Sequence, residues 1–294
     1  MAQNNSKLKL GLVQAKVSNK IDTNLNKTAK SIKKAAEKGA NIVCLQELFA
    51  VPYFAQTENK EFFKLAEAIP GKITSFLCQA AKENSIAIIG GSLFEKGDDN
   101  KYYNTSLVFD ANGKLIAKYR KIHVPYDPNY YEQYYFSSGN LGYAQAALNN
   151  IKNNINNIKI APLICYDQWY PEAARINALK GAQIIFYPTA IGWFERLKKY
   201  EPFSAKRWEN AMRAHASMNG IYVAAVNRVG KEDELTFWGN SFIADPYGEV
   251  IAKASSSKEE VLIAEIDINK VKASQEGWGF LRNRKPESYK DLAK

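Results

Sequence analysis

The sequence predicts an α/β fold in a single domain, and two observations support this prediction. Short apolar segments typical of buried strands alternate with longer segments typical of helices, in both halves of the chain. The composition does not shift along the 294 residues, and nothing resembles a linker. We therefore expect one domain over residues 1–294, with two similar half-sheets, helices outside them, and a C-terminal tail from about residue 270.

The first half of the chain predicts a β-α-β-α-β order, typical of parallel strands joined by crossover helices. Asp22 is a plausible N-cap of the first helix, and Gly39 is its expected stop. A hairpin is expected next, because turn clusters at 98–100 and 111–113 bound two further strands. The expected strands are 8–13, 42–45, 86–94, 103–110 and 114–121, and the expected helices are 22–40 and 72–84.

Two irregular stretches follow the hairpin. Residues 122–143 form a long aromatic loop with five tyrosines by residue 135. A structureless loop of that length in a compact domain is more often functional than idle. Residues 145–157 are rich in Asn and Lys and predict only a polar excursion.

The second half resumes the alternation of strands and helices. A turn is expected at 246–248, and Trp278, Phe280 and Leu281 make the tail apolar enough to need a partner surface. The expected strands are 158–164, 183–187, 221–227 and 261–266, and the expected helices are 171–180 and 203–219.

Composition excludes several classes of protein. The hydrophobic fraction of 46% is ordinary for a globular protein, and no apolar run approaches the roughly 20 residues of a membrane span. No signal peptide is evident, and three scattered cysteines suit a reducing compartment, so we expect a cytoplasmic protein. Two histidines and no C-x-x-C argue against zinc, and we expect neither a metal nor a cofactor.

The net charge of +10 raises the alternative of a non-catalytic module that binds nucleic acid. The lysines are dispersed rather than clustered in a stripe, and no recognition motif is present. We therefore expect neither a nucleic acid nor a membrane as a partner. A charge of this sign mildly favours an anionic substrate by long-range steering.

Cys165 follows a mostly apolar strand and precedes Pro171, which is expected to open a helix. Backbone N–H groups and the helix dipole at such a junction favour an anion, which would lower the pKa of the thiol. We therefore expect Cys165 to be a nucleophile. The other two cysteines, Cys44 and Cys78, are expected to be packing residues.

Glu47 and Lys121, like Cys165, lie at the ends of expected strands, where sites in α/β sheets are usually built. A thiol that attacks a carbonyl-type carbon needs a base, and the oxyanion needs a positive donor. The alternative base is a histidine: His123 is two residues past Lys121, whereas His215 is mid-helix and is expected to be buried.

Three segments resemble the signature segments of the nitrilase superfamily of carbon–nitrogen hydrolases, in the same order. They are LQELF at 45–49, YRKIHVP at 119–125 and LICYDQWYPEAAR at 163–175, within a resemblance that covers roughly residues 8–285. The resemblance implies a four-layer α-β-β-α sandwich.

The same resemblance implies a role for each matched residue. Glu47 would be the general base and then acid, Lys121 the oxyanion stabiliser, and Cys165 the nucleophile. The backbone N–H of Tyr166 would be the second oxyanion donor. Glu132 falls where family members carry a glutamate that orients the lysine and the substrate.

Three segments look most like N-carbamoylputrescine amidases, which hydrolyse a ureido group to release putrescine, carbon dioxide and ammonia. They are DQWYPEAAR at 167–175, FYPTAIG at 186–192 and YYEQYYF at 130–136. Three departures occur: Ser138-Gly139-Asn140 replaces a Pro-Gly-Asp, the run before the Cys165 strand is longer, and residues 193–200 do not follow the subgroup's acidic loop. The last departure concerns the far end of the substrate, not the chemistry.

The expected substrate-binding residues are Tyr166, Trp169, Tyr130, Thr189 and Ala190. Trp169, Tyr130 and Trp193 are of a type that can hold an alkylammonium by cation–π contact, with core or lid packing as the equal alternative.

Asp127, Asp167 and Glu195 are candidate counter-charges for an ammonium. Arg175 is expected either to clamp a substrate carboxylate or, as an ion pair, to bind Glu172. The alternative substrates in the same fold are N-carbamoyl-β-alanine and a simple ω-amide. A homodimer or higher homo-oligomer is expected from the resemblance and the apolar tail.

Overall fold

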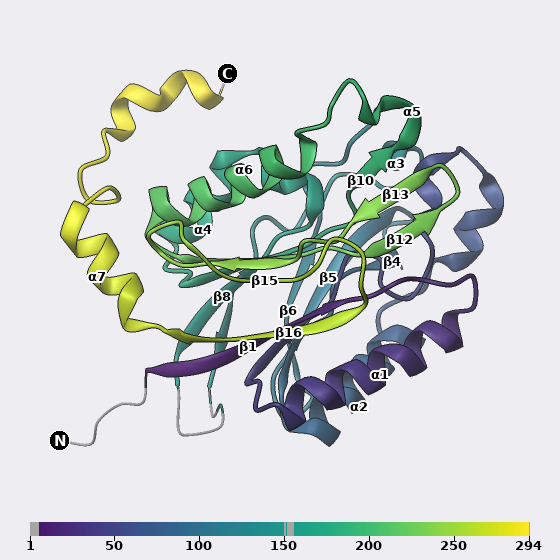
Figure 1. Cartoon of the computed structure of the whole chain (residues 1–294), viewed down its shortest axis with the longest axis horizontal. Coiled ribbons are helices and arrows are strands. Elements are labelled where there is room, and N and C mark those ends of the chain that lie inside the picture. The colour runs from purple at the N-terminus through teal and green to yellow at the C-terminus, as the bar shows by residue number, and fades with distance from the viewer. Residues whose placement is uncertain (1–5, 150, 152–155, 294) are drawn as a thin grey trace.

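The computed structural model describes residues 6–149, 151 and 156–293. Figure 1 shows four layers, in which helices cover the outer faces of two β-sheets that pack against each other. Two helices lie on each outer face. They are α1 (Ile21–Glu37) and α2 (Lys72–Asn84) on one side, and α4 (Pro171–Leu179) and α6 (Ser204–Asn219) on the other. The α/β class and the expected four-layer sandwich are therefore confirmed.

The first sheet has the order β16-β1-β2-β3-β5-β4 among the described residues, with β6 paired to β5. Strands β1, β2 and β3 are parallel, whereas β16, β5, β4 and β6 join antiparallel. The strands are β1 (Lys7–Gln14), β2 (Ile42–Cys44), β3 (Ala87–Ile89), β4 (Leu93–Lys96), β5 (Tyr102–Phe109), β6 (Leu115–Arg120) and β16 (Glu260–Asp267).

The second sheet has the order β15-β14-β11-β9-β8-β7, again within the described ranges, with parallel pairing of β8, β9 and β11. A small antiparallel sheet of β10, β13 and β12 lies beside it. The strands are β7 (Ala146–Leu148), β8 (Ile158–Pro162), β9 (Ile184–Pro188), β10 (Gly192–Phe194), β11 (Tyr222–Val226), β12 (Val229–Glu232), β13 (Leu235–Trp238), β14 (Phe242–Ala244) and β15 (Val250–Lys253).

Alternation along the buried strands explains how one sheet serves two apolar layers. In β2, Ile42 and Cys44 belong to the cluster between the two sheets, whereas Val43 belongs to the cluster under α1 and α2. Side chains of successive strand residues point to opposite faces, so this three-residue strand contributes to both layers. Cys44 is fully buried, which confirms it as a packing residue.

The structure differs from the sequence prediction in three elements. The strand expected at 86–94 is split into β3 and β4, because Gly91 has φ +57° and a Cβ there would lie 2.0 Å from the carbonyl oxygen of Gln46. Asp22 is not the N-cap of α1, which is Lys20; it lies in the first turn and pairs with Lys72. The aromatic loop contains a short helix, α3 (Glu132–Tyr135).

The polar excursion at 145–157 holds β7, which extends the second sheet, while residues 150 and 152–155 lie outside the described part of the chain. The C-terminal segment forms α7 (Asn269–Trp278) and the 3-10 helix η4 (Pro286–Ala293). Trp278 is 70% exposed and stacks on Phe280, whereas Leu281 packs against the core. A subunit contact through this tail stays a prediction.

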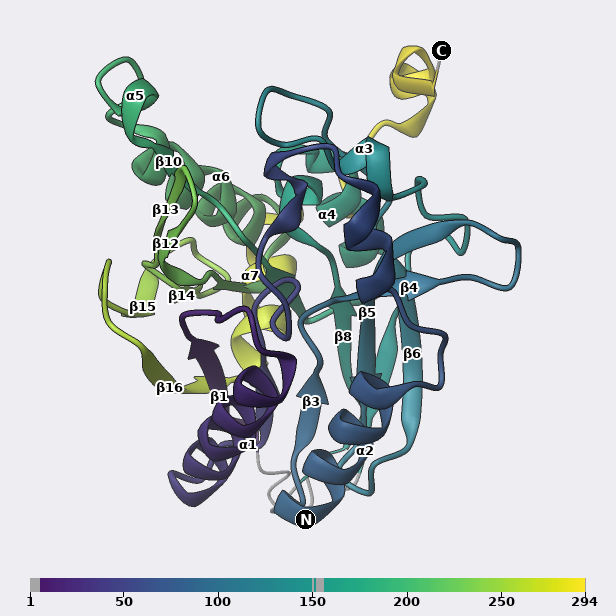
Figure 2. The ribbon, with the colours of Figure 1, turned by 90° about the vertical axis from the view of Figure 1, so that its right-hand side faces the viewer.

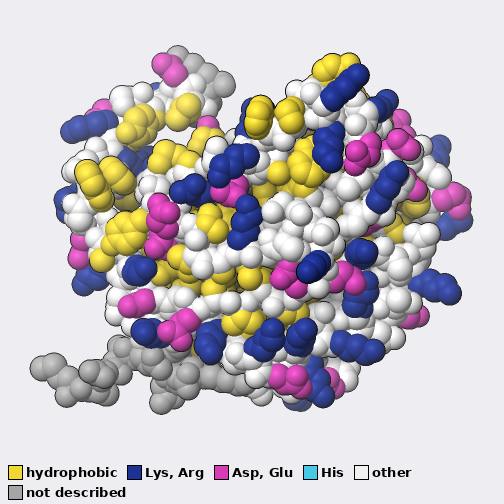
Figure 3. Space-filling model, in the orientation of Figure 1, with side chains coloured by type: hydrophobic (Ala, Val, Ile, Leu, Met, Phe, Trp, Pro, Cys, Tyr) yellow, Lys and Arg dark blue, Asp and Glu magenta, His cyan; other side chains and the backbone are white. Residues whose placement is uncertain are grey.

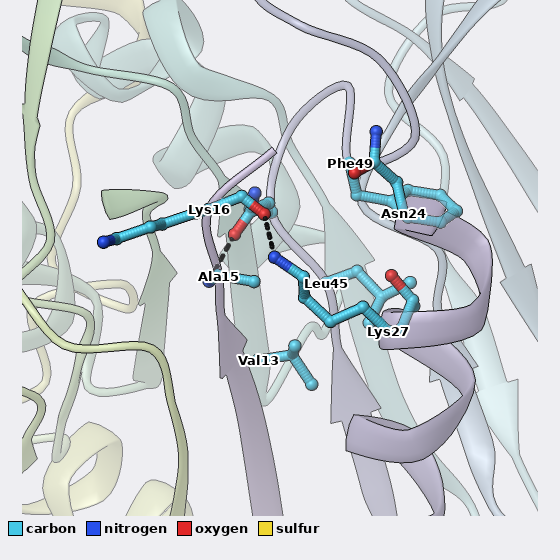
Figure 4. A pocket seen from close by; sticks show the side chains of 9 residues that line it. Val13, Ala15, Lys16, Asn24, Lys27, Leu45 and Phe49 are labelled. Carbon is cyan, nitrogen blue, oxygen red and sulfur yellow. Dashed lines mark hydrogen bonds between the residues drawn. The ribbon is translucent and has the colours of Figure 1, made fainter. Parts of the chain in front are cut away.

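The end of β1 is tied to the segment that leads to Glu47. The backbone N–H of Ala15 donates to Gln46 Oε1, and Lys27 Nζ donates to the carbonyl oxygen of Lys16 (Figure 4). The cavity beside these groups measures about 10 Å³, room for about one water molecule. The cavity is therefore too small for a substrate.

Lysine and arginine side chains lie dispersed among acidic ones over the face that Figure 3 shows, rather than in one stripe. Within the described ranges, no helix is long and apolar enough to cross a membrane.

Candidate active site

Cys165 lies in a sharp turn between a strand and a helix. Strand β8 ends at Pro162, and Cys165 opens the 3-10 helix η3 (Cys165–Trp169), six residues before α4 begins at Pro171. The φ of Cys165 is +41°, a left-handed conformation that is rare outside glycine and clusters at active sites. The expected junction is therefore present, but a short 3-10 helix, not α4, begins at the thiol.

Asp167 holds this turn to the neighbouring sheet. Its Oδ2 accepts the backbone N–H of Ile164 at 2.9 Å and the hydroxyl of Tyr119 at 2.8 Å. Its Oδ1 accepts the backbone N–H of His123 at 3.1 Å and lies 2.7 Å from His123 Nδ1. Asp167 is fully buried, and its carboxylate oxygens bind groups of the protein itself, so it is not a counter-charge for a substrate.

Glu47 follows β2 in a second strained bend, where Leu48 has φ +46°. Buried groups hold this bend: Ser92 Oγ accepts the backbone N–H of Leu48, and Arg228 Nη2 donates to the carbonyl oxygens of Glu47 and Leu48 at 2.7 and 3.0 Å. Arg228 Nη1 also binds the Glu232 carboxylate. The bend is thus fixed from the opposite half of the chain.

Lys121 follows β6 and joins two carboxylates. Its Nζ lies 3.0 Å from Glu47 Oε1 and 2.6 Å from Glu132 Oε2, and all three side chains are buried. Glu132 is the first residue of α3, and its Oε1 accepts the hydroxyl of Tyr53 at 2.7 Å. α3 contacts the 3-10 helix η1 (Phe54–Gln56), which belongs to the segment after β2, and Figure 2 shows α3 above β3, β5 and β8. The structure therefore brings the predicted Glu47, Lys121 and Glu132 together.

One ammonium balances two carboxylates in this cluster. Burial alone would lower the pKa of Lys121, but the charges of Glu132 and Glu47 raise it above its ordinary value. The pKa of Glu132 is raised, mainly by burial. The charge of Glu47 also raises it, whereas the charge of Lys121 lowers it. Lys121 is therefore an ammonium throughout the neutral range.

The pKa of the Cys165 thiol is raised, contrary to the sequence prediction. Burial is the main cause, and the charge of Glu47 adds to it, whereas Lys121 and a backbone hydrogen bond with Ala190 act in the opposite direction. Desolvation outweighs the favourable dipoles of the turn, because the thiol is buried rather than exposed at a helix end. Formation of a thiolate there therefore requires a proton acceptor beside the sulfur.

A cavity of about 640 Å³ opens onto Cys165 and Glu132. Four of the five predicted substrate-binding residues line it, and so does Trp193. The exception is Thr189, whose hydroxyl bonds Gln168 Oε1 and the carbonyl oxygen of Tyr187 instead. The residues that line the cavity are Pro125, Asp127, Pro128, Tyr130, Glu132, Cys165, Tyr166, Gln168, Trp169, Ala190, Ile191, Gly192, Trp193, Phe194, Leu197, Lys198, Glu201, Ser204, Arg207 and Trp238.

Charged residues of both signs lie at this cavity. Asp127 lines it as expected, whereas Glu195 does not, and Glu201 takes a place that the sequence did not indicate. The chain's own cations occupy the tryptophan faces: Lys198 lies 4.9 Å from the ring of Trp193, and the guanidinium of Arg207 lies 5.7 Å from the ring of Trp169.

Neither histidine nor Arg175 serves this site. His123 binds Asp167 and stacks on Tyr170 at 3.7 Å, and His215 is buried, as expected, with Nε2 at 2.8 Å from the Gln168 carbonyl oxygen. Burial lowers the pKa of His215. Arg175 does not line the cavity, its Nη1 has no hydrogen-bond partner, and no ion pair joins it to Glu172 among the described residues, so neither alternative for Arg175 is seen.

Tyr53, Asn104 and Arg228 contact the site but were missed in the sequence. Asn104 Nδ2 donates to Glu47 Oε1 at 2.8 Å. Tyr53 follows Glu47 by only six residues, and this short distance in the sequence indicates that it could lie near the site. Asn104 and Arg228 are distant in the sequence, and no local pattern marks them. Within the described ranges, no group of three or more His, Cys, Asp or Glu forms a metal site.

The comparisons with known proteins agree with this geometry. The carbon-nitrogen hydrolase family model matches residues 9–276. The N-carbamoylputrescine amidase of Solanum lycopersicum is 38% identical over 300 residues, covering 99% of this chain and 97% of that protein. The citrullinase of Francisella tularensis is 35% identical and covers 98% of each chain.

The crystal structure of a carbon-nitrogen hydrolase from Helicobacter pylori G27 has a TM-score of 0.91 and 37% identity, and the alignment covers 98% of this chain and 99% of that one. The family and the relatives support one kind of chemistry, the hydrolysis of a non-peptide amide. The chain therefore belongs to the carbon–nitrogen hydrolase family of the nitrilase superfamily.

Proposed function

We propose that Cys165, Glu47, Lys121 and Glu132 form the catalytic centre of this hydrolase. The observation that carries the proposal is the burial of one ammonium between two carboxylates at the end of the cavity that contains the thiol. Burying three charged groups costs free energy through desolvation, so a site that keeps them is a candidate for function. Titratable groups with perturbed pKa values in a cleft are candidates for catalysis.

The proposed reaction begins with proton transfer from the thiol of Cys165 to Glu47. The sulfur attacks the carbonyl carbon of a ureido group, and the oxyanion is held by Lys121 and the backbone N–H of Tyr166. Tyr166 is the second residue of η3, where N–H groups lack partners within the helix. Losing one such oxyanion donor typically costs about 3–4 kcal/mol of barrier.

Glu47 then returns the proton to the leaving nitrogen, which departs as ammonia. A water molecule, deprotonated by Glu47, attacks the thioester-like carbon and releases an N-alkyl carbamate, which yields the free amine and carbon dioxide. Glu132 takes no proton in this scheme. Its carboxylate holds Lys121 Nζ at 2.6 Å and is itself held by Tyr53.

We propose N-carbamoylputrescine as the substrate. The relative in Solanum lycopersicum, which bears that activity in its name, supports this choice. Within the cavity, Asp127 and Glu201 supply negative charge for the distal ammonium, and the aromatic walls suit a butyl chain. A four-carbon chain with one charged end needs an apolar channel and one counter-charge, and the cavity contains both.

The second candidate is a ureido amino acid such as citrulline. Lys198 and Arg207 line the same cavity and would pair with the carboxylate that such a substrate carries beside its ammonium. The relative named citrullinase in Francisella tularensis supports this alternative. The other candidates are N-carbamoyl-β-alanine and an ω-amide, which lack the distal ammonium.

Ammonia release from these four compounds, measured side by side with the purified protein, tests the proposal. N-carbamoylputrescine is expected to have the highest kcat/KM, and a higher value for citrulline would reverse the order of the two candidates. Cys165→Ala is expected to abolish turnover and leave the circular dichroism spectrum unchanged. Full activity in that variant would refute the proposed chemistry.

A further inference from the structure

The four carboxylate oxygens around Lys121 are not equivalent. Both oxygens of Glu132 have donors: Oε1 accepts from Tyr53 and Oε2 from Lys121 Nζ. On Glu47, Oε1 accepts from two donors, whereas Oε2 is buried and has no hydrogen-bond partner among the described residues. Leaving a buried carboxylate oxygen without a hydrogen-bond donor costs free energy, so the unpaired Oε2 of Glu47 needs an explanation.

The second donor to Glu47 Oε1 is the amide of Asn104, on β5. Asn104 is 1% exposed, and its Nδ2 lies 2.8 Å from Glu47 Oε1. An ionised carboxylate only accepts hydrogen bonds, so the amide must present its NH₂ and not its oxygen. The backbone carbonyl oxygen of Asn104 also accepts the backbone N–H of Lys121 at 2.8 Å. One residue of β5 thus holds both members of the ion pair.

We propose that Asn104 is a positioning residue that reserves Glu47 Oε2 as the atom that takes the thiol proton. This inference rests on the proposed role of Glu47 as the base. A proton on Oε1 would disrupt two hydrogen bonds, one of them to an ammonium, whereas a proton on Oε2 disrupts none. Asn104 and Lys121 together also prevent rotation of the carboxylate, so the free oxygen keeps one direction.

The physical contribution of Asn104 differs from that of Lys121. Lys121 has to stabilise an oxyanion, and its bond to Glu47 loosens when it does so. Among the described residues, the side-chain amide of Asn104 donates a hydrogen bond to Glu47 alone, so this bond is available throughout the reaction. A hydrogen bond to an ionised carboxylate stabilises the ionised form, and Asn104 Nδ2 supplies one to Glu47 Oε1.

Asn104→Leu tests the inference, because it keeps the size of the side chain and removes the donor. The expected result is a fall in kcat/KM for N-carbamoylputrescine of roughly tenfold to a hundredfold, carried by kcat, with KM within about threefold of wild type. The acid limb of kcat/KM against pH is expected to move to higher pH, because the ionised carboxylate has lost a hydrogen-bond donor.

Thr105→Val is the matched control. Thr105 is the next residue on β5, is fully buried, and donates its hydroxyl to Glu95, a carboxylate outside the site. The control removes a buried hydrogen bond of the same kind from the same strand. It is expected to lower thermal stability without moving the acid limb, and an equal movement in both variants would overturn the inference.

A double-mutant cycle separates positioning from structure. The rate of Cys165 alkylation by iodoacetamide is measured in Asn104→Leu, in Glu47→Gln and in the double variant. If Asn104 acts only through the Glu47 carboxylate, its substitution is expected to change the rate less than twofold once Glu47 is gone. Additive effects would mean a general structural role and would overturn the proposal.

Asn104→Asp keeps the shape of the side chain and covers the case in which Asn104→Leu does not fold. An ionised carboxylate there cannot donate, so kcat/KM at pH 8–9 is expected to fall at least tenfold. Wild-type activity in this variant at that pH would refute the inference. Full activity of Glu47→Gln would instead refute the proposed function itself, so the two failures are distinguishable.

Discussion

Arg228→Lys is expected to destabilise the protein strongly, although it keeps the charge. The guanidinium is fully buried between a carboxylate and two carbonyl oxygens: Nη1 lies 2.7 and 3.0 Å from the oxygens of Glu232, and Nη2 lies 2.7 Å from the Glu47 carbonyl oxygen and 3.0 Å from that of Leu48. A lysine presents one compact ammonium and cannot span both groups as the planar fork of arginine does.

The expected cost follows from the bonds that are lost. Hydrogen bonds that involve a charged group contribute about 1.5–3 kcal/mol each, and breaking a buried ion pair costs about 3–5 kcal/mol. We therefore expect the free energy of unfolding to fall by about 3–5 kcal/mol after Arg228→Lys. With a urea m-value of about 3 kcal/mol/M, the midpoint moves down by about 1–1.7 M. Activity falls too, because the bend that carries Glu47 loses its clamp.

Urea unfolding followed by circular dichroism measures this effect, provided that the m-value is unchanged. Arg213→Lys is the matched control, because Arg213 Nε donates to the Gly248 carbonyl oxygen but the side chain is 33% exposed. Its expected cost is below about 1 kcal/mol. A midpoint for Arg228→Lys within about 0.2 M of wild type, which corresponds to about 0.6 kcal/mol at this m-value, would refute the reasoning.

Three further predictions concern charge, backbone and substrate. Burial would raise the pKa of Glu95, but hydrogen bonds, above all with Arg120, hold it below its ordinary 4.5. The resulting stabilisation is complete above pH 4.5 and is lost as the pH falls through the lower pKa of the folded state. Glu95→Gln is therefore expected to lower the free energy of unfolding by about 3 kcal/mol at pH 7, measured by urea unfolding, and by less at acidic pH. Gly139→Ala places a Cβ 2.1 Å from the Arg120 carbonyl oxygen and should displace Lys121, so a kcat within twofold of wild type would contradict the predicted clash. Asp127→Asn should raise KM for N-carbamoylputrescine about two- to fivefold and leave that for uncharged N-butylurea unchanged, whereas equal shifts would exclude a charge contact.

Local patterns in the sequence predicted the elements that flank the site. Helix α2 begins and ends where the sequence predicts it, at Lys72 and Asn84, because an amphipathic pattern and the residues that bound it suffice for a helix. The split of the third strand at Gly91 was not predictable. It depends on the close approach of Gln46, which is distant in the sequence.

The pKa of Cys165 shows the same division. The turn that carries the thiol was visible in the apolar run before it and in Pro171 after it. Its effect on the thiol was predicted with the wrong sign, because the dipole of a turn is local, whereas burial depends on the whole fold. The prediction that Thr189 binds substrate was wrong for a related reason, because its hydroxyl donates to Gln168 Oε1 and does not line the cavity.

The sequence alone determined the α/β class, the order of the segments, and the three side chains that stand at strand ends. These follow from periodicity and residue type, which are local properties of a chain. Only the tertiary structure decided that Asn104 and Tyr53 hold the two carboxylates, that Arg228 clamps the bend after Glu47, and that one oxygen of Glu47 stays free. Such contacts join residues far apart in the chain, and a hydrogen bond exists only once the folded backbone has placed donor and acceptor within 3 Å or so.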